Sequence, residues 1–125
     1  MKRQTLRKIL SSALLIAGVA FLLASCGGST GTSSADVSQG RESYVATCAL
    51  CHGAEGEGTS RLGKELRGNS FVGSLNDEEL VEFLKAGRPS WDPANERGID
   101  MPPKGGNPAL MDEDLMEIVA YLRTL

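Results

Sequence analysis

One short segment of the chain holds the residues best suited to chemistry. Cys48 and Cys51 are separated by two residues, and His52, the single histidine of the chain, follows directly. Two thiols three positions apart lie on one helical turn, where each can form a thioether with a haem vinyl group. The next residue offers an imidazole to the iron. The spacing C-x-x-C-H therefore predicts one covalently attached haem c, held by Cys48 and Cys51 and ligated by His52.

Three other kinds of site use closely spaced cysteines. A thioredoxin-like redox motif requires a βαβ context, which the sequence around Cys48 lacks. A structural disulfide between Cys48 and Cys51 leaves His52 without a role. A zinc site requires four ligands, and two cysteines with one histidine are too few if the third cysteine, Cys26, carries lipid. Haem attachment uses all three residues of the motif.

A second axial ligand of the iron must be another residue type, because there is no second histidine, and methionine is the natural candidate. Met1 belongs to the leader, and Met111 and Met116 fall at the start of or within the last predicted helix. Met101 lies in a loop, followed by two prolines and two glycines that fix the backbone and let it turn sharply. Met101 is the predicted second ligand; the alternative is a methionine that fills a gap in the core.

The first 25 residues differ from the rest of the chain. They contain four basic residues and no acid, and residues 9–24 are largely apolar. This stretch is shorter than the roughly 20 residues of a membrane-spanning helix, so residues 1–25 are predicted to be a signal peptide. The stretch ends Leu23-Ala24-Ser25-Cys26, which resembles the lipobox of bacterial lipoproteins. The alternatives are an ordinary signal cleaved near Ala24 and an uncleaved helix with Cys26 as a free thiol.

Lipid on Cys26 predicts a protein that is exported and anchored to the membrane surface. Two or more acyl chains hold a protein stably on a bilayer. Residues 27–35 read GGSTGTSSA, which is typical of a flexible linker, so residues 26–35 form the lipidated cysteine and its linker. The haem domain then spans residues 36–125. We expect it on the periplasmic side or outer face of the cell membrane.

Composition excludes several function classes. A chain of 125 residues accommodates one small domain, which rules out a large multidomain enzyme. The whole chain carries 13 basic and 16 acidic residues, and the leader holds four of the basic ones, so residues 26–125 have a formal charge of −7. An acidic domain without a basic cluster is poorly matched to a phosphate backbone, so nucleic-acid binding is disfavoured.

The elements that position these residues are predicted to be helical. No segment alternates Val, Ile or Thr with polar residues as a strand does, so the fold class is all-α. The long irregular segments 53–75 and 88–110 leave a thin core, which a bound group would complete. Three helices are predicted from capping residues and apolar spacing: 37–49 with Asp36 or Ser38 as its cap, 76–87 opened by Asn76 with Glu79, and 112–125.

Residues 36–125 resemble the class I monohaem cytochromes c of the bacterial periplasmic type. The resemblance implies a cytochrome c fold, in which three main helices and long loops wrap around one haem. It also implies that the first and last helices cross at Gly40, Tyr44, Ile118 and Tyr121. The matching segments are Gly40 with Tyr44, Cys48-Ala49-Leu50-Cys51-His52-Gly53, Gly56-Glu57-Gly58, Leu66-Arg67-Gly68, Met101-Pro102-Pro103 and IVAYL at 118–122.

The resemblance assigns further roles near the haem. Leu66 is an expected haem contact, and a backbone carbonyl just before it is expected to accept the Nδ1 proton of His52. Many members carry Gly-Pro before this leucine, whereas this chain has Gly63-Lys64-Glu65-Leu66, so the carbonyl remains and the rigidity of proline is lost.

Three other side chains have open or surface roles. Trp91 either caps the haem edge or hydrogen-bonds a propionate, or is buried in loop packing. Lys104 and Arg88 are expected to be solvated surface cations rather than partners of the propionates.

Histidine and methionine ligation closes both axial positions, which favours an electron carrier over a catalyst. We expect a lipid-tethered carrier of single electrons between a quinol-oxidising complex and a terminal oxidase or another respiratory or photosynthetic acceptor. One alternative is a fixed haem subunit of a larger membrane complex. The other is a haem sensor or peroxidase with an open iron, if Met101 does not bind.

Overall fold

The computed structural model describes residues 33–125. The predicted signal peptide, Cys26 and the linker as far as residue 32 lie outside the described residues. Residues 33–125 contain helices and no strand, apart from one isolated antiparallel bridge between Arg88 and Met101, which confirms the all-α class. Within the same residues, no helix is both long enough and apolar enough to cross a membrane.

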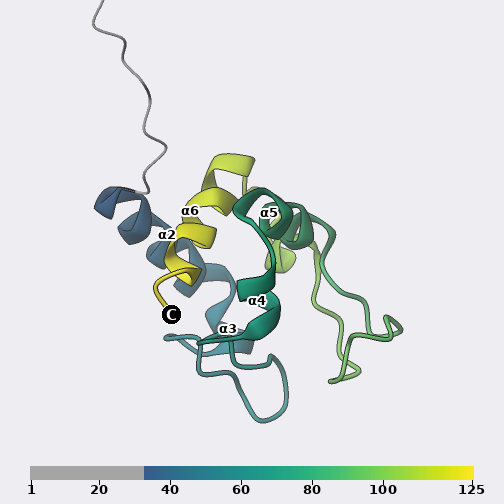
Figure 1. The fold of residues 1–125 in the computed structure, drawn as a ribbon. Helices are drawn as coiled ribbons and strands as arrows, with labels where there is room; N and C mark the ends of the chain where they lie inside the picture. Colours follow the sequence, from purple (N-terminus) through teal and green to yellow (C-terminus); the bar gives the residue numbers. More distant parts are fainter. Residues whose placement is uncertain (1–32) are drawn as a thin grey trace, which may run out of the picture. The chain divides into compact units, whose positions relative to one another are not determined.

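The described chain forms three longer helices connected by loops and shorter helical turns (Figure 1). The longer helices α2, α5 and α6 correspond to the three predicted ones, and α4 lies in a segment that was expected to be irregular. In chain order the elements are α2 (Ser34–Thr47), α3 (Ala49–His52), α4 (Ser70–Ser74), α5 (Asp77–Ala86), η1 (Pro103–Gly106) and α6 (Asp112–Leu122).

Helix α2 begins earlier than predicted. Ser33 is its N-cap: the Ser33 hydroxyl accepts from the Asp36 amide, and the Asp36 carboxylate accepts from the Ser33 amide. The predicted cap at Asp36 or Ser38 was wrong, because the capping box places Asp36 one turn inside the helix. The last residues of the predicted linker are therefore helical. These hydrogen bonds from Ser33 also hold the pKa of Asp36 below its ordinary value.

Helices α5 and α6 match their predictions closely. Asn76 caps α5 with a capping box that includes Glu79, as predicted, and the Gly87 amide closes the helix on the Phe83 carbonyl. Helix α6 starts at Asp112 as predicted but ends at Leu122, before the C-terminus. The next residue is Arg123, whose guanidinium pairs with Asp77 and donates to the backbone carbonyls of Val72 in α4 and Leu75 directly after it.

Helix α6 packs across α2 at the predicted positions (Figure 1). Gly40 meets the α6 backbone so closely that a Cβ atom there would overlap the Glu117 carbonyl. One turn later, the rings of Tyr44 and Tyr121 lie 5.2 Å apart at an angle of 56°. Ile118 is buried beside them. A residue without a side chain lets the helices approach, and the aromatic pair fills the space on one side of the crossing.

The core continues from this crossing to α5. Tyr44, Leu80, Leu115, Ile118 and Val119 are fully buried. Several core residues have a second role, because Tyr44, Leu80 and Ile118 also line a cavity of about 430 Å³. A molecule in that cavity would therefore complete the hydrophobic core.

Candidate functional site

All five predicted haem-site residues of the described chain line one cavity. Its volume is about 430 Å³, and its walls come from all six helical elements, the loop after α3 and the loop before η1. This volume falls in the range of ~300–1,000 Å³ that is usual for small-molecule and cofactor sites. The residues that the sequence singled out and the structure brings together here are Cys48, Cys51, His52, Leu66 and Met101.

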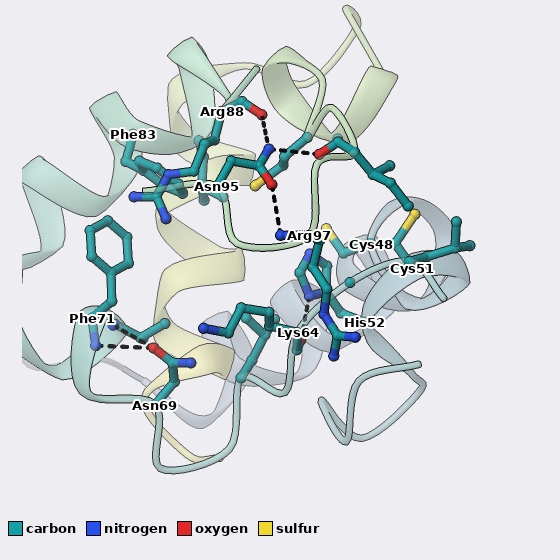
Figure 2. Close-up of a pocket in the computed structure, with 18 of the residues that line it drawn as sticks. Cys48, Cys51, His52, Lys64, Asn69, Phe71, Phe83, Arg88, Asn95 and Arg97 are labelled. Atoms are coloured by element: carbon teal, nitrogen blue, oxygen red, sulfur yellow. Dashed lines mark hydrogen bonds between the residues drawn. The ribbon is translucent and has the colours of Figure 1, made fainter. Parts of the chain in front are cut away.

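The cysteine motif sits where the helical path bends. Cys48 ends α2 and caps the short helix α3, and the amides of Cys51 and His52 both donate to the Cys48 carbonyl. This single turn brings both thiols and the imidazole to the cavity wall, whereas Leu50 between them is 82% exposed. Figure 2 shows Cys48, Cys51 and His52 grouped on one side of the pocket.

The two thiols are free in the structure and form no disulfide with each other. Burial and the neighbouring Cys51 raise the pKa of the Cys48 thiol to about 11, so Cys48 is protonated at neutral pH. Among residues 33–125, no group of three or more His, Cys, Asp or Glu side chains is placed to hold a metal ion.

His52 is oriented by the loop that follows α3. Its Nδ1 atom lies 2.8 Å from the backbone carbonyl oxygen of Lys64. A carbonyl can only accept, so Nδ1 carries the proton and Nε2 of the neutral ring is left free to bind a metal. The hydrogen bond expected before Leu66 is therefore present.

Further hydrogen bonds hold this loop against α3. The Gly63 amide donates to the Cys51 carbonyl at 2.9 Å, and the Thr59 hydroxyl donates to the same carbonyl at 3.0 Å. A Cβ atom at Gly63 would lie 2.7 Å from both the Cys51 carbonyl oxygen and His52 Nδ1. The loop is therefore pinned to α3, and a glycine is required where it passes the imidazole.

Met101 reaches the cavity from the loop before η1. Its amide donates to the Arg88 carbonyl and its carbonyl accepts from the Arg88 amide, both at 2.8 Å. The side chain is half-buried and packs against the core. Met111 and Met116 are 63% and 39% exposed and do not line the cavity. Among the methionines of residues 33–125, Met101 is the one placed at the site.

The expectations for Arg88 and Lys104 were wrong, and so was the burial of Trp91 in loop packing. Trp91 is 81% exposed and does not line the cavity. Arg88 is not a solvated cation, because it is half-buried in the cavity wall. Lys104 is also half-buried, and its ammonium donates to the Leu110 carbonyl at 2.6 Å.

Sequence reasoning missed the aromatic wall of the site. Phe71 on α4 and Phe83 on α5 line the cavity and flank Arg88, on the other side of the pocket from His52 in Figure 2. Asn69 caps α4 by accepting from the amides of Phe71 and Val72. An asparagine before a short apolar segment is the one local signal that marked this helix.

The donor set and the walls of the cavity fit a haem. Two thiols, an imidazole with a free Nε2 and a thioether are the groups that bind haem covalently or ligate its iron. The remaining wall is mostly apolar, which suits the hydrophobic ring system of the group.

Comparison with known proteins decides the family. Residues 35–122 match the family model described as "Cytochrome C oxidase, cbb3-type, subunit III". A cytochrome c-555 of Prosthecochloris aestuarii is 32% identical over 89 residues, which cover 70% of this chain and 85% of the relative. The chain belongs to the class I cytochrome c family. Its cofactor is therefore a covalently bound haem c, and its general function is haem-based electron transfer.

Two further relatives extend the comparison. A cytochrome c-555 of Chlorobaculum thiosulfatiphilum is 28% identical over 87 residues, which cover 93% of that protein. The cytochrome c subunit of a quinone alcohol dehydrogenase from Gluconacetobacter polyoxogenes is 33% identical over 89 residues. This chain spans only 18% of the length of that subunit. No solved structure matches the chain.

Proposed function

We propose that this cytochrome c carries single electrons, with Cys48 and Cys51 as the thioether-forming residues and His52 and Met101 as the two axial ligands. The observation that carries this proposal is the convergence of all four side chains on one cavity. Leu66 lines the same cavity and is the proposed apolar contact of the haem.

The chain's own residues would set the properties of the site. The Lys64 carbonyl holds the His52 Nδ1 proton, which orients the ring and makes Nε2 a stronger donor. The Met101 thioether is a soft ligand that favours the reduced state, and the apolar walls penalise the extra charge of the oxidised state. Haem, when bound, supplies the one-electron chemistry. With both ligands supplied by the protein, no position remains for a substrate, so we propose a carrier without turnover of its own.

We propose further that lipid on Cys26 holds the carrier at the outer face of the cell membrane. There it would pass electrons from a quinol-oxidising complex to a terminal oxidase or another respiratory or photosynthetic acceptor. The small c-555 relatives, which the chain covers almost completely, favour a carrier that works as a separate protein. Residues 26–125 are acidic, which suits transient contact with a partner that presents basic residues.

A fixed subunit of a membrane complex is the second candidate. The name of the matching family and that of the dehydrogenase relative both describe a subunit of a larger assembly. The two candidates share the same site and differ only in whether the partner is permanent. Recovery of the intact protein from membranes with bound partner proteins at high salt would favour the fixed subunit.

Substitution of methionine tests the proposed site. Met101→Ala should retain covalent haem, lower the midpoint potential and allow CO to bind the reduced protein, because the soft ligand is removed. Met116→Ala is the matched control, since Met116 lies outside the cavity on α6 and is 39% exposed. An unchanged spectrum and potential in Met101→Ala would show that Met101 is not the ligand.

A further inference from the structure

The loop that carries Met101 is closed at its base by Arg88. The segment 88–101 leaves α5, runs out from the helices and returns (Figure 1). Its two ends are joined by the reciprocal 2.8 Å hydrogen bonds between the backbones of Arg88 and Met101. Gly87 makes this approach possible: its φ is +69°, and a Cβ atom there would overlap the Met101 carbonyl. The position of the Met101 backbone is thus set by the position of Arg88.

The side chain of Arg88 is itself held on the helical part of the domain. Its guanidinium carbon lies 4.4 Å from the centroid of the Phe71 ring and 4.8 Å from that of the Phe83 ring. The two rings pack edge to face at 4.9 Å. A planar guanidinium stacks well on aromatic faces, so Phe71 and Phe83 form a seat for Arg88 that joins the loop to α4 and α5.

Polar contacts with the Arg88 guanidinium are weak by comparison. The Nε atom is buried and makes no hydrogen bond, and the nearby Asp92 carboxylate is 3.8 Å away, beyond hydrogen-bonding distance. The aromatic rings are therefore the main contacts that hold this side chain. Asn95 adds a separate restraint on the backbone, because its Nδ2 atom donates to the carbonyls of Arg88, Pro89 and Ile99.

We propose that Arg88 is a positioning residue for Met101. Its guanidinium anchors the loop on Phe71 and Phe83, and its backbone passes that restraint to Met101 through the two hydrogen bonds. This inference rests on the proposed ligation of the iron by Met101. If the inference holds, Arg88 keeps the Met101 thioether at the site without touching the thioether. Loss of the contact between Arg88 and its two phenylalanines should then raise the fraction of molecules in which Met101 is away from the site.

Competition by imidazole measures that fraction. A small external ligand binds the oxidised holoprotein only when Met101 has left, so its apparent affinity is proportional to the open fraction. Arg88→Met should bind imidazole about tenfold more tightly than the wild type and should weaken the near-infrared band of methionine bound to ferric haem. Arg67→Met is the matched control: Arg67 is exposed, pairs with Glu65 and does not line the cavity. It should leave both readings unchanged.

The outcomes separate this inference from the proposed function. If the wild type shows the methionine band and Arg88→Met binds imidazole within about twofold of it, the positioning role is wrong and the ligation stands. If the wild type lacks the band, the ligation is wrong and the positioning role falls with it. Phe71→Leu removes one ring of the seat and retains Arg88. It should also tighten imidazole binding, and it decides the question if Arg88→Met yields no folded holoprotein.

Discussion

The Nδ1 atom of His52 donates a hydrogen bond to the backbone carbonyl oxygen of Lys64, 2.8 Å away. This contact fixes the tautomer of the single histidine and aims Nε2 at the cavity. The loop that provides the carbonyl is held by the amide of Gly63 and the hydroxyl of Thr59, which both donate to Cys51. Orientation of the proposed ligand therefore depends on a backbone path that only a glycine at position 63 permits.

Gly63→Ala should disturb this path. The added methyl group would lie 2.7 Å from His52 Nδ1, so the loop must move away and the hydrogen bond to Lys64 must weaken. A less basic imidazole stabilises the oxidised iron less, so the midpoint potential should rise. The free energy of unfolding should fall by about 1–3 kcal/mol, as is usual for overpacking. Potentiometric titration and denaturant unfolding measure the two effects.

Gly73→Ala is the control for that substitution. Gly73 is exposed on α4, and a Cβ atom there would have no other atom within 4 Å. It should leave the potential unchanged. Equal midpoint potentials in the two variants would contradict the role given to Gly63.

Gly40→Ala should separate the helices that form the core. A methyl group at Gly40 would overlap the backbone carbonyl of Glu117, and backbone cannot yield as a flexible side chain does. Alanine favours helix by about 1 kcal/mol over glycine, but the overlap should outweigh this gain and leave a net loss of about 1–3 kcal/mol. Gln39→Ala, at an exposed position of the same helix, should change stability by less than about 0.5 kcal/mol. If the midpoint of denaturant unfolding were the same for Gly40→Ala and the wild type, a close crossing of the two helices would be contradicted.

Tyr44 should make stability fall at alkaline pH. Burial raises the pKa of Tyr44 well above its ordinary value of 10.0. At pH values between the ordinary pKa of Tyr44 in the unfolded chain and its higher pKa in the native state, the native state holds a proton that the unfolded chain has lost. The stability that this group contributes is therefore fully present below pH 10 and falls as the pH rises above 10. The slope contributed by one such group is at most about 1.4 kcal/mol per pH unit. Tyr44→Phe should therefore lose stability less steeply above pH 10 than the wild type.

The same substitution should also cost stability at neutral pH. The Tyr44 hydroxyl donates to the Gly53 carbonyl at 2.8 Å, and loss of such a bond costs about 0.5–1.5 kcal/mol. Tyr121→Phe is a matched comparison, because the Tyr121 hydroxyl lies 3.4 Å from its two acceptors, Ala54 and Glu55. It should cost less. If Tyr121→Phe lost more stability than Tyr44→Phe, the prediction that the Tyr44 hydrogen bond contributes more would be wrong.

Cys26→Ser should abolish attachment of lipid, because the serine hydroxyl cannot carry the thioether-linked lipid. Growth of cells that express each form with a labelled fatty acid, followed by purification with haem absorbance as the marker, measures the lipid on each protein. An unlabelled wild type, or equal labelling of Cys26→Ser and the wild type, would contradict the lipid anchor.

Local sequence signals predicted the parts of the fold that depend on neighbouring residues. Asn76 and Glu79 form a capping box within one turn, so the start of α5 was visible in the sequence. The cysteine motif and Met101 were likewise identified by their types and immediate neighbours. The start of α2 was missed because its cap, Ser33, lies before the first apolar residue of the helix and within a run of small polar residues.

The aromatic wall could not be predicted, because it depends on contacts between distant segments. Phe71 and Phe83 belong to different helices, and Arg88 meets them only when the chain after α5 turns back at Gly87. An isolated arginine in a polar loop is usually solvated, so the expectation for Arg88 failed. Lys104 failed for a similar reason: its φ of 54° and its bond to Leu110 arise from the turn of η1.

The absorption spectrum of the purified holoprotein, made together with a cytochrome c maturation system, tests the central claim most directly. It is recorded oxidised and reduced, with and without CO. Ligation by His52 and Met101 predicts a low-spin spectrum, the near-infrared band of methionine bound to ferric haem, and a reduced spectrum that CO leaves unchanged. High-spin iron that binds CO would contradict the closed site and indicate a sensor or peroxidase, and absence of covalent haem would contradict the proposed roles of Cys48 and Cys51.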